Sequence, residues 1–256
     1  TGTHNTLIGR QSGHAAMTAD YNVAVGYLSM YGTTSCGEAT AVGYRALVAN
    51  TQSGASGATA LGSYTLTNLT TGAGNTAVGC TAMISTVTGA HNTAVGHGSL
   101  YANTGSGNTA VGRSALDTNT SGENNTAMGH DAGGAVTTGT DNVLVGHNAG
   151  DTITTGARNH IFGNSDVSAV GVNDELMFGH GLTGKGTDTF FVGGANGAYQ
   201  HDNASAWSTT SDRRIKKNIV DNTTGLDTIN QIRVRNFEYR TEEEIVDFDN
   251  PKAAVI

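Results

Sequence analysis

Histidine and tyrosine recur immediately after a repeated glycine, and these side chains are the first candidates for chemistry. If successive repeats stack, His130 and His147 form a column, and several chains around one axis would multiply that column into a metal or anion site. The simpler interpretation is a partly exposed polar column along the molecule. We therefore assign no metal and no cofactor to the chain. The residues at this position are Tyr27, Tyr44, His97, His130, His147 and His180.

Carboxylates are the second candidates, because paired carboxylates at a fixed separation hydrolyse glycosidic bonds. Here the acids are scattered over expected turns without a recurring pair, at Glu38, Glu123, Asp131, Asp141 and Asp151. An enzyme acting on surface polysaccharide would have to build a groove from them. Asparagine, in contrast, recurs regularly, and we expect a hydrogen-bonding ladder that satisfies turn backbone. Its members are Asn5, Asn22, Asn75, Asn92, Asn108, Asn125, Asn142 and Asn159.

The element that must position these side chains is a short repeat. The phrase Asn-Thr-Ala-Val-Gly is intact at residues 75–79, 92–96 and 108–112, and variants of it recur from residue 5 onward. The spacing is about 17 residues, which is typical of a solenoid. A unit this small cannot bury its own apolar face, so it gains stability by stacking on its neighbours. The sequence predicts an all-β, parallel β-solenoid (β-roll) of about twelve 17-residue repeats over residues 1–194.

Strand alternation divides each repeat into two faces. The residue before each glycine is apolar and usually β-branched, as at Val78 and Val95, and the residue two places earlier is usually Thr. We expect this Thr-x-Val face to fill each coil, and the Ala between them, as at Ala77, to form an outer stripe along which three chains associate. We also expect a second short β-run in each repeat. Thr-Gly dipeptides, as at residues 88–89, are expected to supply positive φ at the corners.

Composition divides the chain near residue 211. Residues 1–211 contain five Lys or Arg, and residues 212–256 contain eight. We predict a rod at 1–194, a connector at 195–210 with Trp207 as its only large anchor, and a separate domain from 211 to 256.

The net charge of −8 argues against nucleic-acid binding, and no apolar run is long enough for membrane insertion. A start in mid-repeat suggests a piece of a longer protein, and Cys36 and Cys80 are too many repeats apart for a disulfide.

The repeat, written Asn-Thr-Ala-Val-Gly-x-x-Ala/Ser-Leu, resembles the head repeat of trimeric autotransporter adhesins and, more closely, the repeats of phage tail-fibre proteins. The resemblance covers about three quarters of the chain. It implies a left-handed parallel β-roll that assembles as a homotrimer. The spacing itself does not show the handedness.

A charged phrase at residues 211–219, Ser-Asp-Arg-Arg-Ile-Lys-Lys-Asn-Ile, precedes Leu and Ile at helical spacing. Read by itself, it is a helix start with solvated charges and with Ser211 or Asp212 as the N-cap. It also resembles the start of the intramolecular chaperone domain of endosialidase-type phage fibres, a small α+β domain that is incomplete here. That resemblance implies C-terminal trimerisation and release by cleavage between Ser211 and Asp212. The Ser211 hydroxyl would attack, with Lys216 as general base; nearby cations, from Arg213, Arg214 and Lys217, would lower the lysine pKa.

Four classes of function remain. The leading one is a structural segment of a trimeric viral tail fibre, located in the virion. It would space or present binding to a host cell-surface receptor, a glycan contacted elsewhere in the fibre. The main alternative is a bacterial trimeric surface adhesin or extracellular fibre, and a polysaccharide enzyme is third. An ice-binding solenoid is disfavoured, because exposing the Thr-x-Val face would leave only Ala, Asn and Gly to fill the core.

Overall fold

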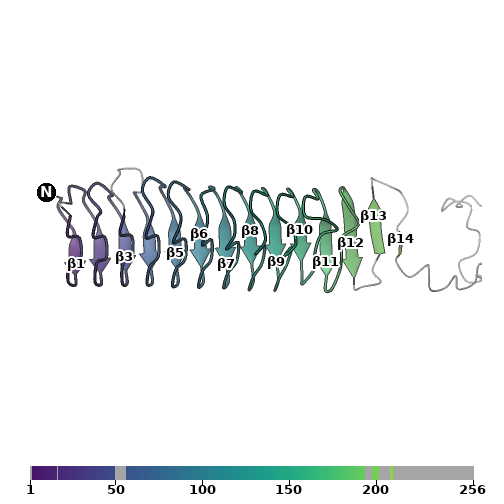
Figure 1. Cartoon of the computed structure of the whole chain (residues 1–256), viewed down its shortest axis with the longest axis horizontal. Coiled ribbons are helices and arrows are strands. Elements are labelled where there is room, and N and C mark those ends of the chain that lie inside the picture. The colour runs from purple at the N-terminus through teal and green to yellow at the C-terminus, as the bar shows by residue number, and fades with distance from the viewer. Residues whose placement is uncertain (1, 16, 50–55, 194–197, 202–207, 210–256) are drawn as a thin grey trace, which may run out of the picture. The chain divides into compact units, whose positions relative to one another are not determined.

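The computed structural model describes residues 2–15, 17–49, 56–193, 198–201 and 208–209. Over these residues the chain forms strands and turns, with no helix. The strands follow one another in a single row (Figure 1). Parallel pairing runs from β1 to β12, and β13 and β14 continue the sheet with antiparallel pairing. The predicted parallel β-solenoid is confirmed.

In chain order the strands are β1 (Thr6–Ile8), β2 (Val23–Val25), β3 (Thr40–Val42), β4 (Thr59–Leu61), β5 (Thr76–Val78), β6 (Thr93–Val95), β7 (Thr109–Val111), β8 (Thr126–Met128), β9 (Val143–Val145), β10 (His160–Phe162), β11 (Leu176–Gly179), β12 (Thr189–Gly193), β13 (Ala198–His201) and β14 (Ser208–Thr209). Equivalent positions of successive repeats lie side by side. For example, β5 and β6 place Ala77 beside Ala94 and Val78 beside Val95. One repeat therefore makes one rung, and neighbouring rungs are about 4.8 Å apart.

The two faces of the strands are the reverse of the sequence-based expectation. Ala77, Ala94 and Ala110 are fully buried, whereas Val95 is 37% exposed and Met128 is 47% exposed. The alanine column fills the inside of the coil, and the Thr-x-Val face points outward. The predicted outer alanine stripe is therefore wrong.

The reason lies in the second phrase of each repeat, which supplies the large side chains of the core. Leu100 and Leu116 are fully buried, as are Leu47, Leu66 and Met83 at equivalent positions. A thin coil accommodates one large side chain opposite one small one, so Leu on one side requires Ala on the other. The packing argument against an ice-binding solenoid is thus also wrong, because Leu and Met fill the core when the Thr-x-Val face is exposed.

The turns differ from expectation in two ways. The second phrase forms turns and no second β-run, and its Leu100 and Leu116 have left-handed backbone, with φ of 50° and 52°. The glycine of the Thr-Gly dipeptides is not among the residues with positive φ. It is small for another reason, because a Cβ at Gly89 would collide with the carbonyl oxygen of Gly105 in the next rung.

The predicted asparagine ladder is confirmed. Asn92, Asn108 and Asn125 are fully buried. The Oδ1 of Asn92 accepts the backbone N–H of Asn108 at 2.8 Å, and the Oδ1 of Asn108 accepts that of Asn125 at 2.9 Å. The Nδ2 of Asn92 donates to the carbonyl of Gly105 at 2.9 Å. Each asparagine therefore satisfies buried backbone groups of the next rung.

Glu175 ends this ladder. Its backbone N–H still donates to Asn159 Oδ1 at 3.1 Å, but its carboxylate accepts the N–H of Gly186 at 2.6 Å and the hydroxyl of Thr189 at 3.3 Å. A carboxylate has no N–H to donate to a further rung. The substitution of Glu for Asn thus lies close to the place where parallel pairing gives way to the antiparallel pairing of β13.

Candidate functional site

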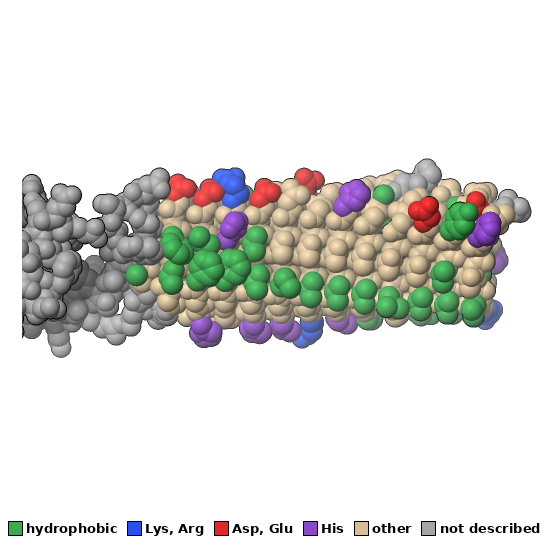
Figure 2. All heavy atoms as spheres, turned by 180° about the vertical axis from the view of Figure 1, so that it is seen from behind, with side chains coloured by type: hydrophobic (Ala, Val, Ile, Leu, Met, Phe, Trp, Pro, Cys, Tyr) green, Lys and Arg blue, Asp and Glu red, His purple; other side chains and the backbone are tan. Residues whose placement is uncertain are grey.

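The outward Thr-x-Val face is a continuous exposed apolar stripe along the rod (Figure 2). Its members come from the first and third positions of the strands, and one rung follows another at about 4.8 Å. The stripe widens near β10 to β12, where Phe162 stacks on Phe178 with ring centroids 4.7 Å apart. Soluble monomers seldom expose long contiguous apolar surface, so such a stripe indicates an interaction site. Its exposed large side chains include Ile8, Val23, Leu61, Val95, Met128, Phe178 and Val192.

One border of the stripe is rich in histidine, and we call it the His edge. It contains the residues that follow the strand glycines: His97, Arg113, His130, His147, Asn164 and His180. Arg113 Nη1 lies 3.1 Å from His130 Nε2, and the rings of His130 and His147 stack with centroids 5.3 Å apart. The predicted polar column is therefore present. No group of three or more His, Cys, Asp or Glu in the described part of the chain is arranged to hold a metal ion.

The opposite border is acidic, and we call it the Asp edge. It contains residues that precede the strands: Glu123, Asp141, Arg158, Asp174 and Asp188. Figure 2 shows acidic side chains, with some basic and His side chains among them, along one border of the apolar stripe, and His and Arg side chains along the other. Arg158 donates to Asp174 through Nε at 2.7 Å and Nη2 at 2.8 Å. This contact holds the pKa of the Asp174 carboxyl below its usual value.

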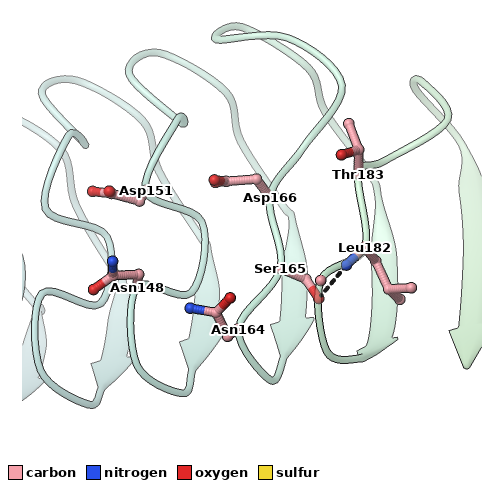
Figure 3. A pocket seen from close by; sticks show the side chains of 8 residues that line it. Asn148, Asp151, Asn164, Ser165, Asp166, Leu182 and Thr183 are labelled. Atoms are coloured by element: carbon pink, nitrogen blue, oxygen red, sulfur yellow. Dashed lines mark hydrogen bonds between the residues drawn. The ribbon is translucent and has the colours of Figure 1, made fainter. Parts of the chain in front are cut away.

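A hollow of about 260 Å³ lies between the last rungs, lined by Asn148, Asp151, Asn164, Ser165, Asp166, Gly181, Leu182 and Thr183 (Figure 3). Burial, and then the nearby Asp166, raise the pKa of the Asp151 carboxyl. Asp166 Oδ1 accepts both the N–H and the hydroxyl of Thr152, at 2.8 and 3.1 Å. Ser165 Oγ accepts the N–H of Leu182 at 3.3 Å. Most of these polar groups form hydrogen bonds between neighbouring rungs, so we interpret the hollow as part of the structure and not as a binding site.

The residues predicted to carry self-cleavage lie outside the part of the chain that the structure describes. They are Ser211, Asp212 and Lys216, with Arg213, Arg214 and Lys217 beside them. Trp207 of the predicted connector lies outside it as well. The domain boundaries therefore stay predictions. Cys36 is buried and Cys80 is exposed, and no disulfide joins them in the described part of the chain.

Sequence reasoning missed the exposed face because it assigned to the core only the large residues of the strand phrase, Asn-Thr-Ala-Val-Gly. The phrase after the glycine also contains a large residue that could have revealed the error. Its Leu or Met recurs once per repeat, as at Leu100 and Leu116, and an interior that already contains that column has no room for the Val column.

Comparison with known proteins identifies the C-terminal segment. Residues 211–253 match the family model described as chaperone of endosialidase. No curated protein and no solved structure matches the chain. A parallel β-solenoid rod that precedes a chaperone-of-endosialidase segment fits a phage-fibre-like protein, and this family implies trimeric fibre assembly. In the described part of the chain, no helix is both long and apolar enough to cross a membrane.

Proposed function

We propose that the chain is a structural segment of a homotrimeric phage tail fibre or tailspike, located in the virion. Three rods associate through the Thr-x-Val face and together space or present a region that binds a host-surface glycan. Residues 211–256 guide assembly of the trimer. The observation that carries this proposal is the match of residues 211–253 to the chaperone family, and the exposed apolar stripe supports it.

A bacterial trimeric adhesin would use a similar rod, and the chaperone segment favours the phage fibre over it. An ice-binding solenoid is a second candidate, because it would need the Thr-x-Val face exposed. Here that face also carries Leu61, Met128 and Phe178, each more than 40% exposed. These side chains interrupt a regular Thr-x-Val array and suit contact with protein. A stable monomer in solution would favour the ice-binding class.

Light scattering of the uncleaved full chain is expected to give three times 26.1 kDa, about 78 kDa. Val111→Asp should leave the β-sheet circular dichroism of the coil intact and abolish the trimer, because the carboxylate lies on the apolar face between chains. Ala110→Asp should abolish the β signal itself, since Ala110 is fully buried and an unpaired buried carboxylate costs several kcal/mol. A wild-type monomer, or equal loss of β signal in both variants, would contradict the proposal.

Deletion of residues 211–256 before expression is expected to give aggregated or misregistered rods, because near-identical repeats specify register weakly.

We include self-cleavage of the intact chain in the proposal. Ser211 Oγ attacks the carbonyl carbon of the Ser211–Asp212 bond, and Lys216 takes the hydroxyl proton and passes it to the departing Asp212 amine. The C–N bond breaks as a four-membered cyclic ester forms within Ser211, and water opens this ester to leave the Ser211 carboxylate and free hydroxyl.

The cleavage step predicts a second fragment on a denaturing gel. Ser211→Ala and Lys216→Ala should each remove this fragment and leave the trimer unchanged. Normal trimerisation of the deleted chain would refute the assembly role. An uncut wild-type chain would refute the cleavage step and leave the assembly role standing.

A further inference from the structure

On two rungs the borders of the Thr-x-Val face place an acid and a histidine at opposite ends of the same strand. Beside β9 the Asp edge has Asp141 and the His edge has His147. Beside β11 they have Asp174 and His180.

The rung between these two, β10, differs from both of them at both borders. The Asp edge carries the cation Arg158, and the His edge carries the neutral Asn164. Both borders therefore differ on the same rung. Among the described residues, the structure records no contact between Arg158 and Asn164 of one chain that would explain why they differ together. Arg158 is directed along its own edge to Asp174, and Asn164 Nδ2 donates to the carbonyl of His147 at 2.8 Å.

We infer that the Asp edge of each copy docks against the His edge of the next copy, an inference that rests on the trimer proposed above. In this arrangement Arg158 of one copy lies opposite Asn164 of the next, and this pair fixes the register of the two copies. The occupant of each edge is therefore a second copy of this chain. In a ring with cyclic symmetry, adjoining copies meet through two different edges, and the same residue lies at the same level in every copy. From one edge of a rung to the other is a step of six residues, about a third of the 17-residue repeat. Along the rod axis this step rises by about 1.7 Å, well under the spacing of about 4.8 Å between rungs. Each level therefore brings together the two edge residues of the same strand.

The register follows from what a slip would do. A shift by one rung in one direction places Arg158 opposite His180 and leaves Asp141 opposite Asn164. A shift in the other direction places Arg158 opposite His147 and leaves Asp174 opposite Asn164. Of these three registers, only the unshifted one gives both Asp141 and Asp174 a histidine partner and places Arg158 opposite the amide of Asn164. The Oδ1 of Asn164 is an acceptor suited to the guanidinium of Arg158.

Each exposed pair contributes little alone, but the trimer repeats the whole set at three interfaces. From β5 to β7 the strands distinguish registers poorly, because their Thr, Ala and Val columns are uniform. From β8 to β11 the exposed strand residues vary, as at Met128, Phe162 and Phe178, and the edge pairs add to the register preference there.

Cysteine cross-linking tests the docking in the full chain, with Cys80→Ser as the background. Asp141→Cys with His147→Cys pairs two edges on one level and is expected to give covalent dimers and trimers on a non-reducing gel. The matched control, Asp141→Cys with Asn164→Cys, is one rung out of register and should give at least ten-fold less. Six residues span at most about 20 Å, and the extended strand Val143–Val145 between the two cysteines of the first variant keeps them too far apart within one chain for a disulfide.

A charge exchange tests the register pair independently. Asn164→Arg should lower the trimer fraction about ten-fold, whereas Asn164→Gln and the exposed Ser168→Arg should leave it unchanged. The double variant Arg158→Asn with Asn164→Arg should restore the trimer, which separates recognition from a folding defect. A trimer by light scattering without matched cross-links, stronger cross-linking of the shifted pair, or failure of the exchange would overturn the edge inference and leave the trimer standing. A monomer would overturn both.

Discussion

Gly112→Ala is expected to lower the free energy of unfolding by about 3 kcal/mol or more. Gly112 follows β7 and has a φ of 138°, a region that side chains with a Cβ rarely adopt. A Cβ built there would collide with the carbonyl oxygen of Gly129 and lie 2.6 Å from its carbonyl carbon. Both obstacles are backbone atoms of the next rung, so no side chain can move aside to make room.

The matched control is Gly98→Ala, in the turn after the preceding strand. Gly98 has a φ of 66°, and the nearest atom to its Cβ would be Ser114 Oγ at 3.8 Å. The left-handed backbone alone costs about 1–2 kcal/mol. Urea unfolding followed by circular dichroism, at equal protein concentration, should place the Gly112 variant well below the Gly98 variant. Equal midpoints would show that neighbouring rungs separate readily at the glycine column.

The fold could be predicted from the sequence because its main constraint is periodic. A repeat of about 17 residues forces Ala77 beside Ala94 and Val78 beside Val95 whichever face is inside. The asparagine ladder was predictable for the same reason, since a buried amide that recurs once per rung has another amide above it. Neither conclusion depends on the direction in which the strands face.

The direction of the faces could not be read from β-propensity, because a Thr-x-Val surface suits a strand on either side. It depends on volumes summed around the coil, and the side chains of Leu100 and Leu116 decide it. Those residues reach the interior from left-handed backbone in turns, with φ of 50° and 52°. Propensity does not anticipate left-handed leucine, so strand alternation alone led to the wrong face.

The candidate site was predictable only in its parts. The column of His130 and His147 follows from the period, and their ring stacking confirms it. Its relation to the Asp edge required knowing that both borders flank an exposed face. For Ser211 and Lys216, the sequence motif and the family match agree on the segment, and their chemical roles stay predictions.

Asn125→Leu is expected to lower the free energy of unfolding by roughly 3–6 kcal/mol, because it leaves several buried groups without partners. Asn125 is fully buried. Its Oδ1 accepts the N–H of Asn142 at 3.0 Å, and its Nδ2 donates to the carbonyl of Gly139 at 2.8 Å. A leucine supplies neither group. The exposed neighbour Asn124 provides the control, since Asn124→Gly keeps its left-handed backbone and should change the unfolding midpoint little.

Asn125→Asp separates the two halves of the amide. The carboxylate still accepts the N–H of Asn142, but it cannot donate to Gly139 and it faces the Oδ1 of Asn108, which now lies 3.2 Å from Nδ2. Burial and this acceptor both favour the protonated form, so the pKa of the new carboxyl should be raised. A raised pKa in the folded state adds stability below the unfolded value and loses it as pH rises through the folded value. The Asp variant should therefore regain part of its midpoint between pH 7 and pH 4.5 relative to wild type, whereas the Leu variant should show no such recovery. A pH-independent deficit in the Asp variant would show that the ladder position is open to water.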